Sequence, residues 1–377
     1  METVRKIEFC RHNLDEKDIE YAEKTLRTLF LTTGSVTAEF EKKFAEYAGL
    51  PHAIAVTSCT AALHLSLLAL DIGPGDEVIT TPMTFLASAT SIMHTGAKPV
   101  FADVLPENGL MDPAKVKKAI TKKTKAILPV HLYGAMVDMK AIKKIADESG
   151  LKIVEDCAHA IESERDGVRP GDLSDAACYS FYATKNLTSG EGGAVGTKKP
   201  DLAERVKILR LHGMSSDAAS RYTSLYKHYD MIALGWKYNM DNIHASLLVH
   251  QIDRLESALK RREEIARRYE MVLKSIPGIE VPTVPGKSAR HLQTFWVKAE
   301  IRDEILKKLQ ERGIGVAVNY KAMHTFTYFK ETFGYKAADF PIAYEIGRRT
   351  ITLPLYPKMT EEEVNYVIAA IKETFKQ

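Results

Sequence analysis

Residues 176–197 read AACYSFYATKNLTSGEGGAVGT, in which two short apolar runs flank Lys185 and a glycine-rich turn. The runs 176–181 and 193–197 have the length and composition of buried strands. A lysine held between them is an unusual choice for a surface charge. Burial disfavours its ammonium form and lowers its pKa. The amine that remains is a nucleophile that can form a Schiff base with a carbonyl compound.

The sequence before this stretch alternates short apolar runs with helical patterns. The apolar runs predict strands at 53–56, 77–80, 99–102, 125–130 and 152–155. The helical patterns predict helices at 61–70, 87–94, 113–120 and 139–148. Such alternation favours a mostly parallel sheet with helices between its strands. With the two runs around Lys185, we predict an α/β fold with a seven-stranded sheet.

The pattern changes after Pro200 and becomes mainly helical. It predicts helices at 242–272, 302–312 and 360–375, short strands at 292–299 and 315–319, and a linker at 276–288 rich in proline and glycine. We predict a large α/β domain over residues 1–250 and a smaller α+β domain over residues 251–377.

The composition is that of an ordinary globular protein. The chain has 377 residues, 45% hydrophobic and 27% charged, which is long enough to bury a substantial core. Lys and Arg together number 52 against 49 Asp and Glu, a formal charge of +3. This balance, without a basic block that contains aromatic residues, argues against nucleic-acid binding.

The cysteines and the N-terminus exclude further classes. Cys10, Cys59, Cys157 and Cys178 form no Cys-x-x-Cys pair, so we expect no metal site and no disulfide framework. Residues 1–11 lack the apolar stretch of a signal peptide, and no apolar run reaches membrane-spanning length. We expect a cytoplasmic enzyme that acts on small molecules, with no membrane partner.

Two segments carry hydroxyl groups that suit a phosphate. Ser58-Cys59-Thr60 lies between a predicted strand and a predicted helix, and free amides at a helix N-terminus favour an anion. Ser58 or Thr60 capping the helix without a ligand is the alternative. Ser180, five positions before Lys185, is a further phosphate candidate.

Other candidates also follow predicted strands. Asp156 can pair with the ring nitrogen of pyridoxal phosphate (PLP), whose ring then acts as an electron sink; a helix cap or an ion pair is the alternative. His159 is either near the phenolic oxygen of PLP or a packed core histidine. Phe85 can stack on a flat ring or pack in the core. In open α/β sheets, ligands bind beyond the carboxyl ends of the strands. No Gly-x-Gly-x-x-Gly and no P-loop occurs, which argues against dinucleotides and nucleoside triphosphates.

These segments resemble the PLP-dependent sugar aminotransferases of the DegT/DnrJ/EryC type, within fold type I. The resemblance covers nearly the whole chain, and the matching segments include 31–36, 58–65, 73–79, 96–100, 130–134, 155–160 and 180–187. Cys59 stands where the family usually has glycine.

The resemblance implies a role for each residue at the cofactor. Lys185 would form the Schiff base with PLP and shuttle the proton. The cofactor contacts implied are Asp156 at the ring nitrogen, Phe85 on the ring, His159 near the phenolic oxygen, and Ser58, Cys59, Thr60 and Ser180 at the phosphate. Family members are homodimers with shared active sites. The segment 235–240 matches the loop borrowed by the partner, with Asn239 or Lys237 as the second phosphate contact.

The resemblance also implies a substrate class. It is closest to enzymes that aminate C4 of a UDP-linked 4-keto sugar, such as UDP-4-amino-4-deoxy-L-arabinose aminotransferases. Thr33, His212, Lys237 and His324 are the residues expected at the substrate, and His324 and His212 have a packed or surface histidine as the alternative.

The expected reaction is a two-stage transamination with L-glutamate as amino donor and a nucleotide-linked keto sugar as acceptor. Alternatives are a dTDP- or GDP-linked 3- or 4-keto-6-deoxy sugar, a cyclitol ketone, or a non-catalytic PLP-binding regulator. A sugar dehydratase on the same fold would carry histidine in place of Lys185, so the lysine argues against it.

Overall fold

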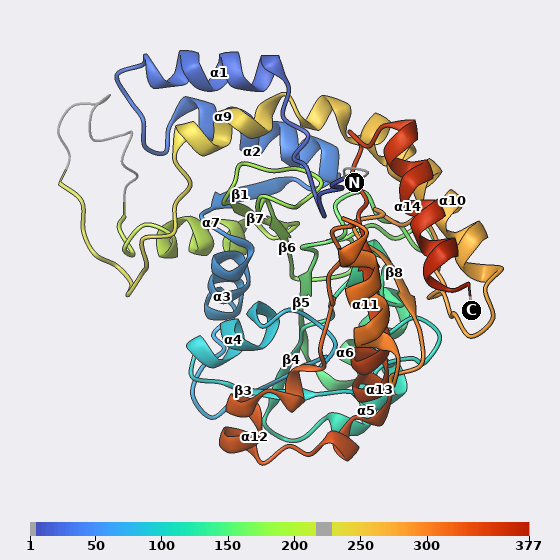
Figure 1. Ribbon diagram of the computed structural model, residues 1–377. Helices are drawn as coiled ribbons and strands as arrows, with labels where there is room; N and C mark the ends of the chain where they lie inside the picture. Colours follow the sequence, from blue (N-terminus) through green and yellow to red (C-terminus); the bar gives the residue numbers. More distant parts are fainter. Residues whose placement is uncertain (1–4, 216–227, 377) are drawn as a thin grey trace.

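A computed structural model describes residues 5–215 and 228–376 of the chain (Figure 1). Its main sheet has seven strands. These are β1 (His52–Val56), β2 (Glu77–Thr80), β3 (Lys98–Phe101), β4 (Thr124–Ile127), β5 (Lys152–Asp156), β6 (Ala176–Ser180) and β7 (Gly193–Thr197). The seven predicted strands are confirmed, each to within a few residues.

The strand order is β1-β7-β6-β5-β4-β2-β3. Strand β7 runs antiparallel to both of its neighbours, and the remaining pairs are parallel. The carboxyl ends of β1, β2, β4, β5 and β6 therefore meet at one edge, where β7 begins. The mostly parallel α/β sheet predicted from the sequence is confirmed.

Helices cover both faces of the sheet because the strand residues alternate between two cores. Ile54 and Val56 pack on one face with α3, while Ala53 and Ala55 pack on the other face with α2 and α9. In the first two-thirds of the chain the helices are α1 (Glu16–Leu26), α2 (Ser35–Ala48), α3 (Cys59–Ala69), α4 (Ala87–His94), α5 (Pro113–Ala119), α6 (Met139–Ser149), α7 (Pro200–Leu209) and α9 (Asn242–Val249). In Figure 1, α1 and α9 lie side by side above the sheet.

The C-terminal part has its own small sheet and core. Strands β8 (Gln293–Trp296) and β9 (Thr350–Leu353) pair antiparallel. The helices are α10 (Leu255–Lys274), α11 (Arg302–Glu311), α12 (Thr327–Phe333), α13 (Pro341–Arg349) and α14 (Glu361–Thr374). Helix α10 packs on α14, as the right side of Figure 1 shows. The domain boundary at residue 250 stays a prediction.

Two predictions in this part are wrong in detail. The helix expected over 242–272 is divided between α9 and α10 at a short 3-10 turn, Ile252–Arg254. At that point the Gln251 side chain donates to Thr188 O at 2.7 Å, a tertiary contact that helical periodicity does not reveal. The strand expected over 315–319 is replaced by isolated bridges, one of them between Ala317 and Thr352.

The N-terminal segment joins this C-terminal part. The N–H of Ile7 donates to Gly313 O at 2.8 Å, and the N–H of Gly315 donates to Ile7 O at the same distance. The Ile7 side chain is buried in the core formed by α10, α11 and α14.

Within residues 5–215 and 228–376, we find no helix with both the length and the apolar character needed to cross a bilayer. The cytoplasmic location stays a prediction.

Candidate active site

Lys185 lies in the loop after β6, and its side chain is half-buried. Burial lowers its pKa from 10.5 to about 8, against the opposing charges of Asp156, Cys59 and Cys10. The Nζ atom lies 3.4 Å from His291 Nε2. The structure thus places at the strand edge the nucleophilic amine that the sequence predicted.

Asp156 is the last residue of β5, and 5% of it is exposed. The Ser88 hydroxyl, on α4, donates to its Oδ2 at 2.7 Å, and the N–H of Ala158 donates to its Oδ1 at 3.1 Å. These donors fix the carboxylate at the same edge as Lys185. The charge of Asp156 raises the pKa of Lys185 and so opposes the effect of burial on it.

The turn Ser58-Cys59-Thr60 forms the start of α3. Ser58 is the N-cap, and its Oγ accepts from the N–H of Ala61 at 3.0 Å. The N–H groups of Cys59 and Thr60, at the first positions of the helix, have no intrahelical acceptor. The capping alternative is therefore present, together with amides suited to an anion.

Gly193 allows this turn to approach β7. A Cβ atom built on Gly193 would lie 2.4 Å from the carbonyl carbon of Ser58 and 2.6 Å from the nitrogen of Cys59. Gly193 also pairs in register with Ser180, whose buried hydroxyl accepts from the N–H of Tyr182 at 3.4 Å. The β7 glycine thus places the Ser58 turn and Ser180 on either side of one strand.

His159 lies in a group of three aromatic side chains. Its Nδ1 accepts from the N–H of Tyr133 at 3.3 Å, and its Nε2 lies 3.1 Å from the Tyr320 hydroxyl. The His291 ring lies tilted against it at a centroid distance of 4.4 Å. Burial, and then the charge of Lys185, hold the pKa of His159 well below 6.5. A neutral ring with Nδ1 as acceptor carries its proton on Nε2, which donates to Tyr320.

Phe85 follows β2 and is 58% exposed, so it is not a core residue. Its ring centroid lies 6.2 Å from that of Tyr320. Both residues line a cavity of about 610 Å³. An exposed aromatic ring beside the site has the placement needed to cover a flat ligand, which stays a prediction.

Thr33, Lys237 and Asn239 form one hydrogen-bonded group. Asn239 Oδ1 accepts from Lys237 Nζ at 2.7 Å, and Asn239 Nδ2 donates to Thr33 Oγ1 at 2.7 Å. The adjacent Tyr238 O accepts from the N–H of Thr57 at 2.9 Å. This group therefore lies beside the end of β1 in its own chain, and its contact with a partner's phosphate stays a prediction.

The two remaining histidine candidates have different surroundings. His212 is exposed, and its backbone N–H donates to Trp236 O at 2.9 Å. His324 is fully buried, with its ring centroid 5.0 Å from that of Phe340. The surroundings of His324 fit the packed alternative, because it lies outside the residues that line the 610 Å³ cavity. The substrate roles of both stay predictions.

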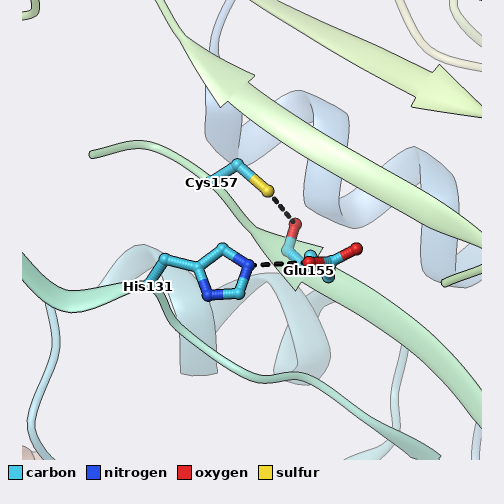
Figure 2. Close-up of side chains that lie close together, drawn as sticks. All are labelled: His131, Glu155 and Cys157. Carbon is cyan, nitrogen blue, oxygen red and sulfur yellow. Dashed lines mark hydrogen bonds and ion pairs between the residues drawn. The ribbon is translucent and has the colours of Figure 1, made fainter. Parts of the chain in front are cut away.

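His131, Glu155 and Cys157 form a second polar cluster, with all three side chains buried (Figure 2). His131 Nε2 lies 2.7 Å from Glu155 Oε2, while its Nδ1 accepts from the N–H of Val137. The other Glu155 oxygen accepts from Gly171 N at 2.8 Å, and the Cys157 thiol points to Glu155 O. Burial raises the pKa of the Cys157 thiol. Because these groups already satisfy one another, we assign the cluster a structural role.

Sequence reasoning missed three site residues: Ser88, His291 and Tyr320. Ser88 lies on a helix that was predicted, but only the fold directs it at Asp156. His291 and Tyr320 come from the C-terminal part, more than 100 residues beyond Lys185. The one available signal was the pair Arg290-His291 before a predicted strand, which by itself is unspecific.

Residues 12–372 match the DegT/DnrJ/EryC1/StrS aminotransferase family. The chain belongs to this family. It is 44% identical over 372 residues to the spore coat polysaccharide biosynthesis protein SpsC of Bacillus subtilis, covering 96% of this chain and 95% of that protein. It is 36% identical over 376 residues to the UDP-4-amino-4-deoxy-L-arabinose–oxoglutarate aminotransferase of Shewanella sediminis, covering 97% of each.

Solved structures are also similar to this chain. Spr1654 of Streptococcus pneumoniae, assigned as a sugar aminotransferase, matches in its form with pyridoxamine phosphate with a TM-score of 0.92 and 34% identity, over 98% of this chain and 99% of that one. Its PLP form matches with a TM-score of 0.91 and 34% identity, over 98% of both chains. This DegT/DnrJ/EryC1/StrS family member is therefore an aminotransferase, and its relatives carry the cofactor predicted from Lys185 and Asp156.

The residues present in the aminotransferase fit PLP. The donor set combines a nucleophilic amine, a buried carboxylate, free amides at the start of α3 and the hydroxyl of Ser180. Because Gly193 has no Cβ atom, the turn at Ser58-Cys59-Thr60, which would hold the phosphate, can pack tightly against β7.

Proposed function

We propose that this protein is a PLP-dependent sugar aminotransferase that transfers the amino group of L-glutamate to a nucleotide-linked keto sugar. The observation that carries the proposal is Lys185, half-buried at the sheet edge with its pKa lowered to about 8 and Asp156 nearby. Because the chain belongs to an aminotransferase family, the reaction that we propose for this amine is the transfer of an amino group.

PLP, when bound, supplies a carbonyl for Schiff-base formation and a ring that accepts an electron pair. Asp156, held by Ser88, would keep a proton on the ring nitrogen. The Ser58 turn and Ser180 would hold the phosphate through hydroxyl groups and amides. Phe85 would cover the ring, and His159 would face its polar edge.

Lys185 has two tasks in this proposal. Its amine anchors the cofactor, and once released it acts as general acid and base. In the first stage Nζ would move a proton from the α-carbon of glutamate to the cofactor carbon that receives the amino group. In the second stage it would move a proton from that cofactor carbon to the sugar carbon. A pKa near 8 suits both directions, because the ammonium and the amine are both populated near neutral pH.

The cavity of about 610 Å³ supports an anionic, nucleotide-linked acceptor. It joins Phe85 and Tyr320 to three cationic side chains, Arg302, Lys321 and Arg348. Cationic and aromatic groups together suit a diphosphate with a sugar and a base. The Shewanella relative is named for a UDP-linked amino sugar, which supports C4 of a UDP-4-keto sugar as the acceptor position.

We also propose a homodimer with shared sites. Near Lys237 and Asn239 the chain exposes three apolar side chains: Met231 at 61%, Ile232 at 55% and Leu234 at 73%. Exposed apolar clusters of this kind are typical of interaction surfaces. In a dimer, a partner covering this segment would bring Lys237 or Asn239 toward the second site.

The first test is an absorption spectrum of the PLP-loaded protein before and after L-glutamate. Conversion of the PLP band to that of pyridoxamine phosphate supports amino transfer, and Lys185→Ala should abolish it. Lys198→Ala, a change at a surface lysine beyond β7, is the matched control. A Lys185→Ala protein that still turns over would exclude the proposal.

The second test identifies the acceptor. UDP-, dTDP- and GDP-linked keto sugars and a cyclitol ketone are each added to the glutamate-treated protein, and the products are analysed by mass spectrometry and NMR. Amination of the UDP-4-keto sugar at C4 is expected. If the PLP band recovers with another ketone instead, that ketone becomes the proposed acceptor. If the PLP band does not change when glutamate is added, a PLP-binding regulator is favoured.

A further inference from the structure

A continuous line of buried polar groups connects helix α10 to the reactive lysine. Arg262, on α10, pairs with Glu162 at 2.5 Å, and Glu162 accepts from Asn186 Nδ2 at 3.0 Å. Asn186 Oδ1 lies 3.2 Å from His291 Nδ1, and His291 Nε2 lies 3.4 Å from Lys185 Nζ. Glu162, Arg262 and His291 are each less than 9% exposed, and Asn186 and Lys185 are half-buried, so most of this line is shielded from water.

The donor and the acceptor of each hydrogen bond in this line can be assigned by starting from Glu162. The carboxylate of Glu162 and the carbonyl of Ala289, 3.0 Å from Asn186 Nδ2, both accept. The amide nitrogen of Asn186 must therefore face them, and its oxygen must face His291. An oxygen accepts only, so His291 Nδ1 carries a proton and donates it to Asn186 Oδ1.

A neutral imidazole with its proton on Nδ1 has a free lone pair on Nε2. His291 is neutral, because burial, and then the charges of Lys185 and Arg262, hold its pKa well below 6.5. Its Nε2 is therefore a hydrogen-bond acceptor. It faces Lys185 Nζ, which can only donate when it is in the ammonium form.

We propose that His291 is a positioning residue that accepts a hydrogen bond from Lys185 Nζ, and that Glu162 sets this polarity through Asn186. The bond holds the lysine whenever it is not bonded to the cofactor, so that Nζ stays at the site between its two proton transfers. The inference rests on the proposed role of Lys185. It is independent of the sugar.

The His159 ring gives this arrangement its rigidity. It contacts His291 in a tilted arrangement, with an interplanar angle of 33°, and is itself fixed by Tyr133 and Tyr320. His291 Nε2 therefore has one orientation, toward Lys185.

The first experiment determines the tautomer directly. The full chain, freed of PLP, is labelled with ¹⁵N-histidine, and the His291 signals are assigned by their loss in His291→Phe. A proton on Nδ1 and none on Nε2 is expected across neutral pH. A proton on Nε2 would overturn the proposal, because that nitrogen could not then accept from Lys185.

The second experiment compares two variants. His291→Phe keeps the ring that stacks on His159 but has no acceptor, whereas His291→Gln can place an amide oxygen near the position of Nε2. In PLP-free protein, the pH dependence of Lys185 modification by an amine reagent is read by mass spectrometry. His291→Phe should shift this profile to lower pH, since the ammonium loses an acceptor, and His291→Gln should restore it.

Kinetics of the PLP-loaded variants complete the test. In His291→Phe, kcat should fall about tenfold, the worth of one hydrogen bond, while KM for glutamate stays within about twofold. His291→Gln should recover most of kcat. An unchanged modification profile together with normal kcat in His291→Phe would overturn the positioning role. Lys185→Ala tests the proposed function separately.

Discussion

The Ser88 hydroxyl donates a hydrogen bond to Asp156 Oδ2 at 2.7 Å, and so ties the end of β5 to helix α4. Ser88 also lies 2.8 Å from the Thr84 hydroxyl, one residue before Phe85. The carboxylate and the exposed aromatic ring, proposed to contact the same cofactor ring, are thus linked through one buried serine.

Ser88→Ala should weaken PLP binding by about tenfold, because Asp156 loses one of its two donors. The dissociation constant is measured by absorbance titration of PLP-free protein. Ser91→Ala is the matched control, since Ser91 is equally buried on α4 but its hydroxyl donates to Ser88 O. Equal dissociation constants in Ser88→Ala and wild type would contradict the prediction.

The lowered pKa of Lys185 predicts the pH at which PLP-free protein captures the cofactor. Only the amine reacts, so the capture rate should rise with pH and level off above about 8, well short of the ordinary value of 10.5. Asp156 raises this pKa, so Asp156→Asn should move the midpoint to lower pH. Stopped-flow absorbance gives the rates. A rate that keeps rising toward pH 10.5 would show that burial does not control the amine.

Gly193→Ala should damage both stability and cofactor binding. The added methyl group would lie 2.4 Å from backbone of Ser58, which cannot rotate away, and overpacking costs about 1–3 kcal/mol. Gly73→Ala is the control, since its nearest neighbour, Thr95 O, lies at 3.8 Å. Chemical denaturation and PLP titration measure the two effects. If the free energy of unfolding and the affinity for PLP both equal the wild-type values, the turn can move to accommodate the methyl group and the prediction is wrong.

Arg262→Met should destabilise the fold by about 3 kcal/mol or more, because it leaves the buried Glu162 without its counter-ion. Lys143→Ala removes one partner of the exposed Lys143–Asp147 pair and should cost about 0.5 kcal/mol or less. Both values come from urea denaturation. Equal effects in the two variants would show that burial of the Arg262–Glu162 pair adds nothing.

Lys321→Ala should raise KM for the nucleotide-linked sugar several-fold and leave KM for glutamate unchanged. Lys321 lines the 610 Å³ cavity, where its charge would face the acceptor's phosphates. Lys330→Ala, at an exposed position on α12 outside the cavity lining, is the control. Steady-state kinetics with each substrate varied in turn gives both constants. Parallel changes in both KM values would argue against an acceptor-specific contact.

The main sheet was predictable because its strands are short apolar runs between helical patterns, and local composition suffices for that. Strand β7 shows the limit. Its residues were assigned to a strand, but its antiparallel direction follows from the turn after Lys185 and was not predicted. The division between α9 and α10 was also missed, because Gln251 interrupts the helix through a contact 63 residues away.

The site divides in the same way. Asp156 was found because it ends an apolar run, and Lys185 because it lies between two apolar runs. Ser88 and His291 were not, since an ordinary helical serine and a histidine in a loop acquire meaning only from the side chains they meet. Their partners are distant in sequence, and periodicity carries no information on such contacts.

The pairing of Ile7 with the segment around Gly315 bears on the order in which the protein is assembled. The segment that contains Ile7 is synthesised well before its backbone partners, which follow some 300 residues later. All seven strands of the main sheet have been synthesised by Thr197, so the sheet can form before the segment that contains Ile7 has its partners. Closing this long-range contact is therefore a late step, and it also brings the Cys10 thiol onto Thr184 O, next to the reactive lysine. The contact of Cys10 with the loop that carries Lys185 therefore forms only after the segment around Gly313 has been synthesised.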